Sequence, residues 1–175
     1  MRPRTLDGVV GQAHLVGPKG ALRRLMGTGR LPSMVLWGPP GTGKTTLARI
    51  LAEQTGRGFV EFSGVTGSAA ELKKFLLDQA GMPLYRGTAP VIFLDEVHRF
   101  NRAQQDILLP FLERGEAILI GATTENPAFY LNPALRSRCS GSPGPGLRPW
   151  KCSCWRPSTH REWVRPRPPE LRRWP

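Results

Sequence analysis

The feature that most constrains this chain of 175 residues is a glycine-rich loop between a predicted strand and a predicted helix. Residues 38–45, GPPGTGKT, match the pattern G-x-x-x-x-G-K-[ST] and directly follow the apolar run Met34–Trp37. Glycines let the backbone turn tightly enough for several N–H groups to point inward, and the helix that follows adds the positive end of its dipole. The pattern predicts a phosphate-binding loop in which Lys44 reaches the β- and γ-phosphates and the Thr45 hydroxyl binds Mg²⁺. The residues expected at this site are Gly38, Pro39, Pro40, Gly41, Thr42, Gly43, Lys44, Thr45 and Thr46.

Strand and helix patterns alternate along the first 139 residues. Apolar runs at 59–62, 91–94 and 118–122 are typical of strands, and helical patterns separate them. Strands separated by helices predict a parallel sheet covered on both faces, which is an α/β fold of three layers. Asn101 is expected to cap one of these helices, and Pro110 is expected to kink that helix or to end it early.

Two acidic residues directly follow the strand predicted at 91–94. At the carboxyl end of a parallel strand, Asp95 and Glu96 would lie in the crevice where open α/β sheets bind ligands. We therefore expect Asp95 to hold Mg²⁺ through water and Glu96 to polarise the attacking water. After the next strand, Thr124 or Asn126 either faces the γ-phosphate or is an ordinary turn residue.

The composition changes near Cys139. The net charge is +12, from 25 basic and 13 acidic residues. Residues 140–175 are rich in proline, arginine and tryptophan and poor in branched aliphatic side chains, so we expect them to be disordered beside a nucleotide-binding core at 1–139. No apolar run approaches the roughly 18 residues needed to cross a bilayer, and no secretory signal pattern opens the chain. We therefore expect a cytoplasmic protein without a membrane span.

Cysteine and histidine form no strong catalytic or metal pattern. Cys139, Cys152, Cys154 and His160 could be counted as zinc ligands, but the C-x-C spacing lacks the usual gap of about two to four residues. The three histidines form no H-x-x-x-H pair and no nucleophile arrangement. We assign no zinc site and give no catalytic role to His14, His98 or His160.

With these motifs placed, the chain from Arg2 to Cys139 resembles the AAA+ ATPase module of the replication-associated recombination protein A family, the bacterial relatives of Werner-helicase-interacting protein. The segments that carry the resemblance are RPRTLDGVVGQAHLVGP, LWGPPGTGKTTLA, IFLDEVHRFNRAQQDILLP and LIGATTENPAFYLNPALRSRC. The loop and the acidic pair would fit any AAA+ protein. The segments DEVHRFN and QQD, followed by GATTENP, are typical of far fewer families. Clamp-loader subunits and Holliday-junction branch-migration motors are the neighbouring alternatives.

The resemblance implies a P-loop NTPase fold and an enzyme that hydrolyses ATP with Mg²⁺. Val10 and Gly11 match the segment that packs around the adenine, and Thr124 matches the polar sensor on the fourth strand. Arg138 matches the arginine finger that completes the ATP site of the adjacent subunit, although a basic turn with Arg136 would by itself be ordinary. A finger that acts in trans makes hydrolysis depend on assembly. The implied catalytic residues are Glu96, Thr124 and Arg138, and the implied metal ligands are Thr45 and Asp95.

The resemblance also implies partners and a cellular role. The partners would be fork or single-stranded DNA, replication proteins such as single-stranded DNA-binding protein, and further copies of the chain in a homo-oligomer. The processes would be DNA replication, recombination and repair at stalled forks, in the bacterial cytoplasm and in association with the nucleoid.

After Cys139 the chain departs from the family pattern, which continues with a fifth strand beside the P-loop strand, a helical lid and an oligomerisation region. Because the Pro/Gly-rich segment 140–146 predicts neither strand nor lid, we expect Met34–Trp37 to form an exposed sheet edge. The tail is either the product of a frameshifted or truncated gene or a basic, tryptophan-containing segment that binds single-stranded nucleic acid.

Three functions remain open on these grounds. The first is an ATP-driven motor or remodeller, and the second is a nucleotide-binding module with little or no hydrolysis. The third is a small P-loop kinase, against which the adjacent pair Asp95 and Glu96 argues.

Overall fold

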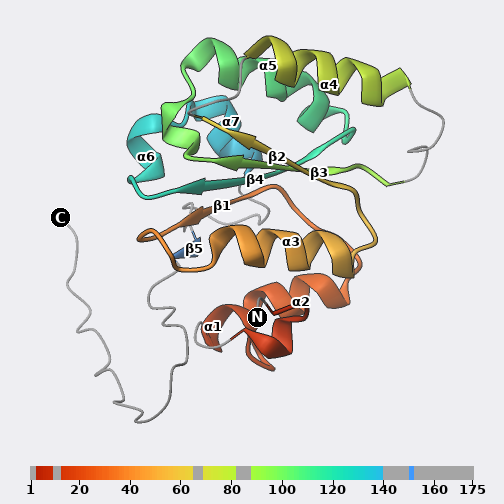
Figure 1. Ribbon diagram of the computed structural model, residues 1–175, viewed down its shortest axis with the longest axis vertical. Helices are drawn as coiled ribbons and strands as arrows, with labels where there is room; N and C mark the ends of the chain where they lie inside the picture. Colours follow the sequence, from red (N-terminus) through yellow and green to blue (C-terminus); the bar gives the residue numbers. More distant parts are fainter. Residues whose placement is uncertain (1–2, 10–12, 65–68, 82–87, 140–149, 152–175) are drawn as a thin grey trace.

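The computed structural model of the chain describes residues 3–9, 13–64, 69–81, 88–139 and 150–151. Strands and helices alternate in it, as the apolar pattern predicts (Figure 1). The helical elements are η1 (Leu6–Gly8), α1 (Ala13–Val16), α2 (Ala21–Gly27), α3 (Lys44–Gln54), α4 (Ala69–Gly81), η3 (Val97–Arg99), α5 (Arg102–Glu113), α6 (Pro127–Tyr130) and α7 (Pro133–Arg138). The strands are β1 (Met34–Trp37), β2 (Phe59–Ser63), β3 (Val91–Asp95), β4 (Ile118–Thr123) and β5 (Trp150–Lys151).

The strands form one parallel sheet in the order β2-β3-β4-β1-β5. Trp37 at the end of β1 is paired with Thr123 at the end of β4, and Ser63 at the end of β2 is paired with Asp95 at the end of β3. The loops that follow these strands therefore leave the sheet at the same edge. This is the edge at which open parallel sheets bind ligands.

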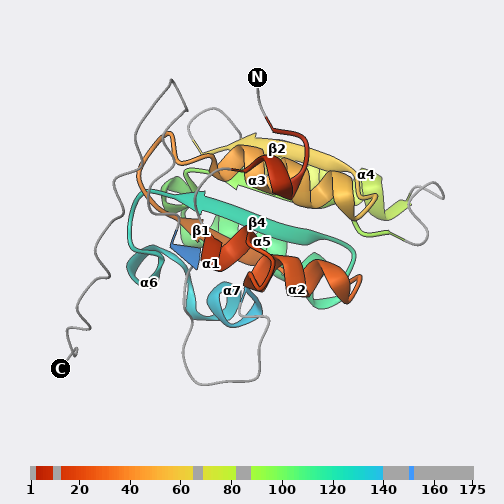
Figure 2. The same cartoon turned by 90° about the horizontal axis from the view of Figure 1, so that it is seen from below.

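Helices cover both faces of the sheet, which confirms the predicted three-layer α/β fold (Figure 1). On one face, α1, α2 and α3 pack against Met34 and Leu36 of β1 and against residues of β3 and β4. Figure 2, seen from below, has α1 and α2 on the near side of the sheet. On the other face, α4, α5 and α7 pack against Val35 of β1 and Ile92 of β3. Successive residues of β1 thus enter opposite layers and are buried in both, as is typical of a central parallel strand.

Helix α5 begins as predicted, and of the two expected effects of Pro110, a kink or an early end, the early end does not occur. The side chain of Asn101 accepts from the N–H of Gln104, and the side chain of Gln104 accepts from the N–H of Asn101, each at 2.9 Å. The helix does not end at Pro110, because it continues to Glu113. Less than one turn follows the proline, so the helix needs to tolerate only the loss of one backbone donor near its end.

A short strand lies where none was expected. β5 pairs with β1 in parallel, with Trp150 opposite Leu36 and Lys151 opposite Trp37. Trp150 and Lys151 both carry backbone N–H groups, so this stretch lacks the obstacle that proline presents to a sheet ladder. The expectation that Met34–Trp37 forms an exposed edge is therefore wrong for Leu36 and Trp37, which pair with β5. The rest of the tail, and with it the expected disorder and the question of a lid, lies outside the described residues.

Gln105 of α5 forms hydrogen bonds with the segment that leads into α7. Its side chain is fully buried, and Nε2 donates to the carbonyl oxygens of Phe100 and Tyr130, both at 2.9 Å. Oε1 accepts from the N–H of Asn132 at 2.8 Å. Asn132 in turn caps α7 by accepting from the N–H of Leu135. Helix α7 is thus fixed on α5 by hydrogen bonds as well as by apolar packing.

None of the helices in the described part is long and apolar enough to cross a membrane.

We expect Gln105→Ala to lower the free energy of unfolding by about 2 kcal/mol, because buried backbone groups lose their hydrogen-bond partner. Chemical denaturation followed by circular dichroism measures this change. The control is Arg102→Ala, an exposed position in the first turn of the same helix, which should change the stability by less than about 0.5 kcal/mol. Equal denaturation midpoints for Gln105→Ala and the parent chain would show that the network is not stabilising.

Candidate nucleotide-binding site

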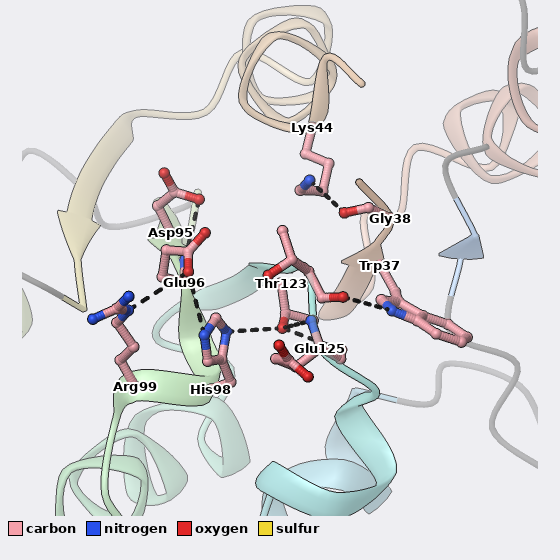
Figure 3. A network of polar contacts seen from close by, with 10 residues as sticks. Trp37, Gly38, Lys44, Asp95, Glu96, His98, Arg99, Thr123 and Glu125 are labelled. Carbon is pink, nitrogen blue, oxygen red and sulfur yellow. Dashed lines mark hydrogen bonds and ion pairs between the residues drawn. The ribbon is translucent and has the colours of Figure 1, made fainter. Parts of the chain in front are cut away.

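The glycine-rich loop joins β1 to α3 and surrounds the ammonium group of Lys44. Gly41 and Gly43 have φ angles of 74° and 80°, a conformation that other residues adopt at a cost. Lys44 is 9% exposed, and its Nζ donates to the carbonyl oxygens of Gly38 and Pro39, both at 2.8 Å (Figure 3). Both of these acceptors are neutral, and charged phosphate oxygens would form stronger, charge-assisted bonds with an ammonium group.

A hollow of about 660 Å³ lies along one side of α3, from Thr45 to Glu53. Thr45 and Thr46 line it from the helix, and Pro3 and Arg4 line it from the N-terminal segment. Its volume is within the range of ordinary ligand pockets, about 300–1,000 Å³. The predicted adenine contacts at positions 10 and 11 lie outside the described residues.

Asp95 is the last residue of β3, and Glu96 follows it in the turn that leads to η3. Oδ1 of Asp95 accepts from the N–H of Glu96 at 3.1 Å, and the carbonyl of Asp95 accepts from the N–H of Gly64 at 2.9 Å. Among the described residues other than glycine, Glu96 alone has a positive φ, 54°. A Cβ on Gly64 would lie 2.7 Å from the carbonyl oxygen of Glu96. The chain after β2 thus packs directly on the turn that carries the acidic pair.

The residues at this edge fit Mg²⁺ by their chemistry. Mg²⁺ is usually bound by one or two carboxylates and keeps waters and substrate phosphates as its other ligands. Asp95 supplies a carboxylate at the end of β3, and Thr45 supplies a hydroxyl in the first turn of α3. Within the described ranges no group of three or more His, Cys, Asp or Glu side chains gathers. A metal held here would therefore depend on the phosphates of a nucleotide.

The loop after β4 contains the predicted sensor residues. Thr124 is half-buried, and its carbonyl accepts from Nε1 of Trp37 at 3.2 Å. Asn126 caps α6, since its Oδ1 accepts from the N–H of Ala128 at 3.0 Å. The threonine whose side chain is buried at the end of β4 is Thr123, which is 1% exposed. The sequence places Thr123 among the polar residues that end this strand, but only Thr124 and Asn126 were expected to face the phosphate.

His98 also joins this site, although no sequence pattern predicted a role for it. Its Nε2 lies 3.3 Å from Oε2 of Glu96, and its Nδ1 lies 3.0 Å from Oγ1 of Thr123 (Figure 3). Nε of Arg99 lies 3.6 Å from the same oxygen of Glu96. His98 and Thr123 are separated by 25 positions, so a search for local histidine motifs does not pair them. The available signal was that both residues follow strands predicted to end at one edge of the sheet.

Arg138, the predicted finger, lies near the end of α7. Its side chain is 52% exposed, and its Nη2 lies 3.0 Å from Oε1 of Glu113 on α5. Arg136, two residues earlier, donates to the carbonyl of Ala128 at 3.3 Å. Arg138 is thus presented at the surface of this chain, where a residue that acts on an adjacent subunit would have to lie.

Cys139 is the one predicted zinc candidate that falls within the described residues. It is buried, and desolvation raises the pKa of its thiol to about 12. The thiolate is the form that binds metals, so this protonated thiol is a poor ligand at neutral pH. Cys152, Cys154 and His160 lie outside the described residues.

Comparisons with known proteins agree with this geometry. The sequence profile of the ATPase family associated with various cellular activities (AAA) matches residues 34–142. The chain belongs to this AAA family. The solved structure of the Thermotoga maritima RuvB Holliday junction branch migration motor superposes with a TM-score of 0.61 at 32% identity, over 78% of this chain and 46% of that one. A P-loop fold of this class is therefore confirmed.

The resemblance to the replication-associated recombination protein A family is confirmed as well. The protein of that name from Haemophilus influenzae is 47% identical over 138 residues, which are 79% of this chain and 31% of that protein. ATPase WRNIP1 of Dictyostelium discoideum is 45% identical over 139 residues, which are 79% of this chain and 16% of that protein. The chain thus spans a third or less of the length of these relatives.

We expect Lys44→Ala to weaken ATP binding at least tenfold, or about 1.4 kcal/mol, because charge-assisted bonds to the phosphates are lost. Titration with a fluorescent ATP analogue measures the change. The control is Lys73→Ala, which removes a lysine from the exposed side of α4 and should leave the affinity unaltered. Coincident titration curves for Lys44→Ala and the parent chain would show that the loop does not hold phosphate through Lys44.

Proposed function

We propose that this AAA protein binds ATP with Mg²⁺ at the glycine-rich loop and hydrolyses it. Lys44 would hold the β- and γ-phosphates, and Thr45 and Asp95 would hold the metal, which would neutralise charge on the transferred phosphate. Glu96 would polarise the attacking water, and Thr124 would contact the γ-phosphate as the sensor. Positions 38–43 and Thr46 would complete the phosphate site, with Val10 and Gly11 beside the adenine.

The observation that carries the proposal is the meeting of three strand ends. The loop that leads to Lys44 follows β1, and Asp95 ends β3 with Glu96 directly after it. Thr123 ends β4, which lies between β1 and β3 in the sheet. A cation, two carboxylates and a hydroxyl therefore face one edge, although they come from separate parts of the sequence. Phosphoryl transfer needs this combination of positioning and charge more than it needs covalent chemistry.

We further propose a role for this activity in DNA replication, recombination and repair at stalled forks. The proposal is supported by a relative named a replication-associated recombination protein and by the likeness to a Holliday junction branch migration motor. The net charge of +12 favours association with a polyanion. Fork or single-stranded DNA, single-stranded DNA-binding protein and further copies of the chain are the proposed partners, in a bacterial cytoplasm and at the nucleoid.

The first test is the hydrolysis of ATP with and without DNA by the parent chain and by Glu96→Gln. We expect Glu96→Gln to bind ATP within about twofold of the parent and to lose most of its turnover, since an amide cannot act as the base that a carboxylate provides. Phosphate release measures turnover, and equilibrium titration measures binding. Parental turnover in Glu96→Gln would assign the base to another residue. Binding without turnover in the parent chain would favour a nucleotide-binding module, and phosphate transfer to an added nucleoside would favour a kinase.

The second test concerns Arg138 and the adjacent subunit. Arg138→Ala keeps an intact phosphate loop, and Lys44→Ala keeps an intact finger. We expect each variant alone to be inactive and their mixture to recover part of the turnover, because a finger from one subunit completes the site of its neighbour. The absence of recovery in a mixture that co-assembles in analytical ultracentrifugation would give Arg138 a structural role.

A further inference from the structure

His98 occupies a bridging position in the site, between the proposed base and the end of the central strand. Its ring contacts Glu96 through Nε2 and Thr123 through Nδ1, at 3.3 Å and 3.0 Å (Figure 3). A third element packs on it, because the ring of Tyr130 on α6 makes an edge contact with a centroid separation of 5.7 Å. The His98 side chain is 14% exposed. Its direction is therefore set by three different parts of the chain.

The donors and acceptors in this chain of contacts are interdependent. A carboxylate only accepts hydrogen bonds, so Nε2 of His98 must donate when it is bound to Glu96. A neutral imidazole then has an acceptor at Nδ1, and the hydroxyl of Thr123 must donate to it. The same hydroxyl oxygen accepts from the N–H of Glu125 at 3.0 Å and lies 3.2 Å from the carbonyl of Glu125.

The single hydroxyl proton of Thr123 has two possible acceptors, Nδ1 of His98 and the carbonyl of Glu125. With Glu96 bound to Nε2, the proton is directed to His98. If Glu96 turns away, the ring can carry its proton on Nδ1 and donate to Thr123, whose hydroxyl then donates to Glu125. The position of the Glu96 carboxylate and the hydrogen bonding of the loop after β4 are thus linked through one ring.

The backbone on both sides of His98 is well fixed, so the linkage does not depend on a mobile turn. The close approach of Gly64 to the Glu96 carbonyl holds the turn after β3. The carbonyl of Thr124 is held by Nε1 of Trp37 at 3.2 Å. The freedom that remains lies in the Glu96 side chain, which is 30% exposed, and in the ring and hydroxyl protons.

We propose that His98 is a positioning residue that holds the Glu96 carboxylate through Nε2 while Thr123 holds Nδ1, and so couples the base to the loop after β4. The proposal rests on the hydrolytic function proposed above and adds a residue that the sequence motifs did not single out. His98 does not exchange a proton with the substrate in this role. Its effect on turnover passes through the direction of Glu96.

A double-mutant cycle in the full 175-residue chain tests the coupling by turnover. We expect His98→Ala and Thr123→Val each to lower kcat roughly tenfold, with ATP binding within about twofold of the parent, and the double variant to lose no more than His98→Ala alone. Thr123→Ser keeps the hydroxyl and should restore kcat. Arg102→Ala is the control for an unrelated change and should leave both constants unaltered. Multiplicative losses in the double variant, or parental kcat in His98→Ala, would overturn the proposal.

A second measurement does not require hydrolysis. Nitrogen-15 NMR distinguishes the two ring nitrogens of a histidine and reports which of them carries the proton. The His98 signals are those missing from the spectrum of His98→Gln. We expect the proton on Nε2 in the chain without nucleotide and a change of the Nδ1 signal in Thr123→Val. Identical Nδ1 signals in the parent and Thr123→Val would overturn the proposal even in an active chain. The expected signals in a chain that neither binds nor hydrolyses ATP would support the contact while the proposed function failed.

Discussion

The parallel pairing of β4 with β1 on one side and β3 on the other is the constraint on which the site depends. All six residues of β4, from Ile118 to Thr123, are buried, and no side chain leaves the strand on an open face. The pairing of Trp37 with Thr123 brings the glycine-rich loop level with the end of β4. The pairing of Leu94 with Gly121 brings the acidic turn to the same level. A shift of β4 by one residue would turn each of its side chains to the opposite face and move Thr123 out of line with both groups.

The position of Arg138 depends on the helices α5 and α7, which pack on one face of this sheet. Helix α7 has only six residues, too few to be stable alone, and its position comes from its neighbours. Gln105 bonds to the carbonyl of Phe100, which follows the acidic turn, and to Asn132, which caps α7. The same buried side chain therefore fixes the chain that leaves Glu96 and the chain that leads to Arg138. In an assembly, the proposed base of one site and the proposed finger for the next would be held by one element.

The sequence predicted what local patterns determine. The motif at 38–45, the cap at Asn101 and the apolar strands need only neighbouring residues, and the structure has them where expected. The bond between His98 and Thr123 and the network of Gln105 join residues that are distant along the chain, so no periodicity reports them. The letters QQD distinguished the family in the sequence, yet only the structure shows Gln105 as a buried bridge. Strand β5 was missed because the high proline content of the tail was taken to exclude any strand there. Trp150 and Lys151, which form β5, are both free of that restriction.

The backbone of Glu96 adds an independent reason to connect this turn with function. Its φ of 54° and ψ of 47° lie in the left-handed region. This conformation raises the free energy of a residue with a Cβ by about 1–2 kcal/mol, whereas glycine adopts it readily. A glycine at this position would relieve the strain, and the turn itself needs no carboxylate, because the N–H of Gly64 bonds to the Asp95 carbonyl. The benefit of glutamate must therefore come from its side chain, and in this structure that side chain is held by His98 and Arg99. A strained backbone that aims one carboxylate, with a neighbour that fixes its direction, is the arrangement expected of a reacting group whose geometry must be accurate.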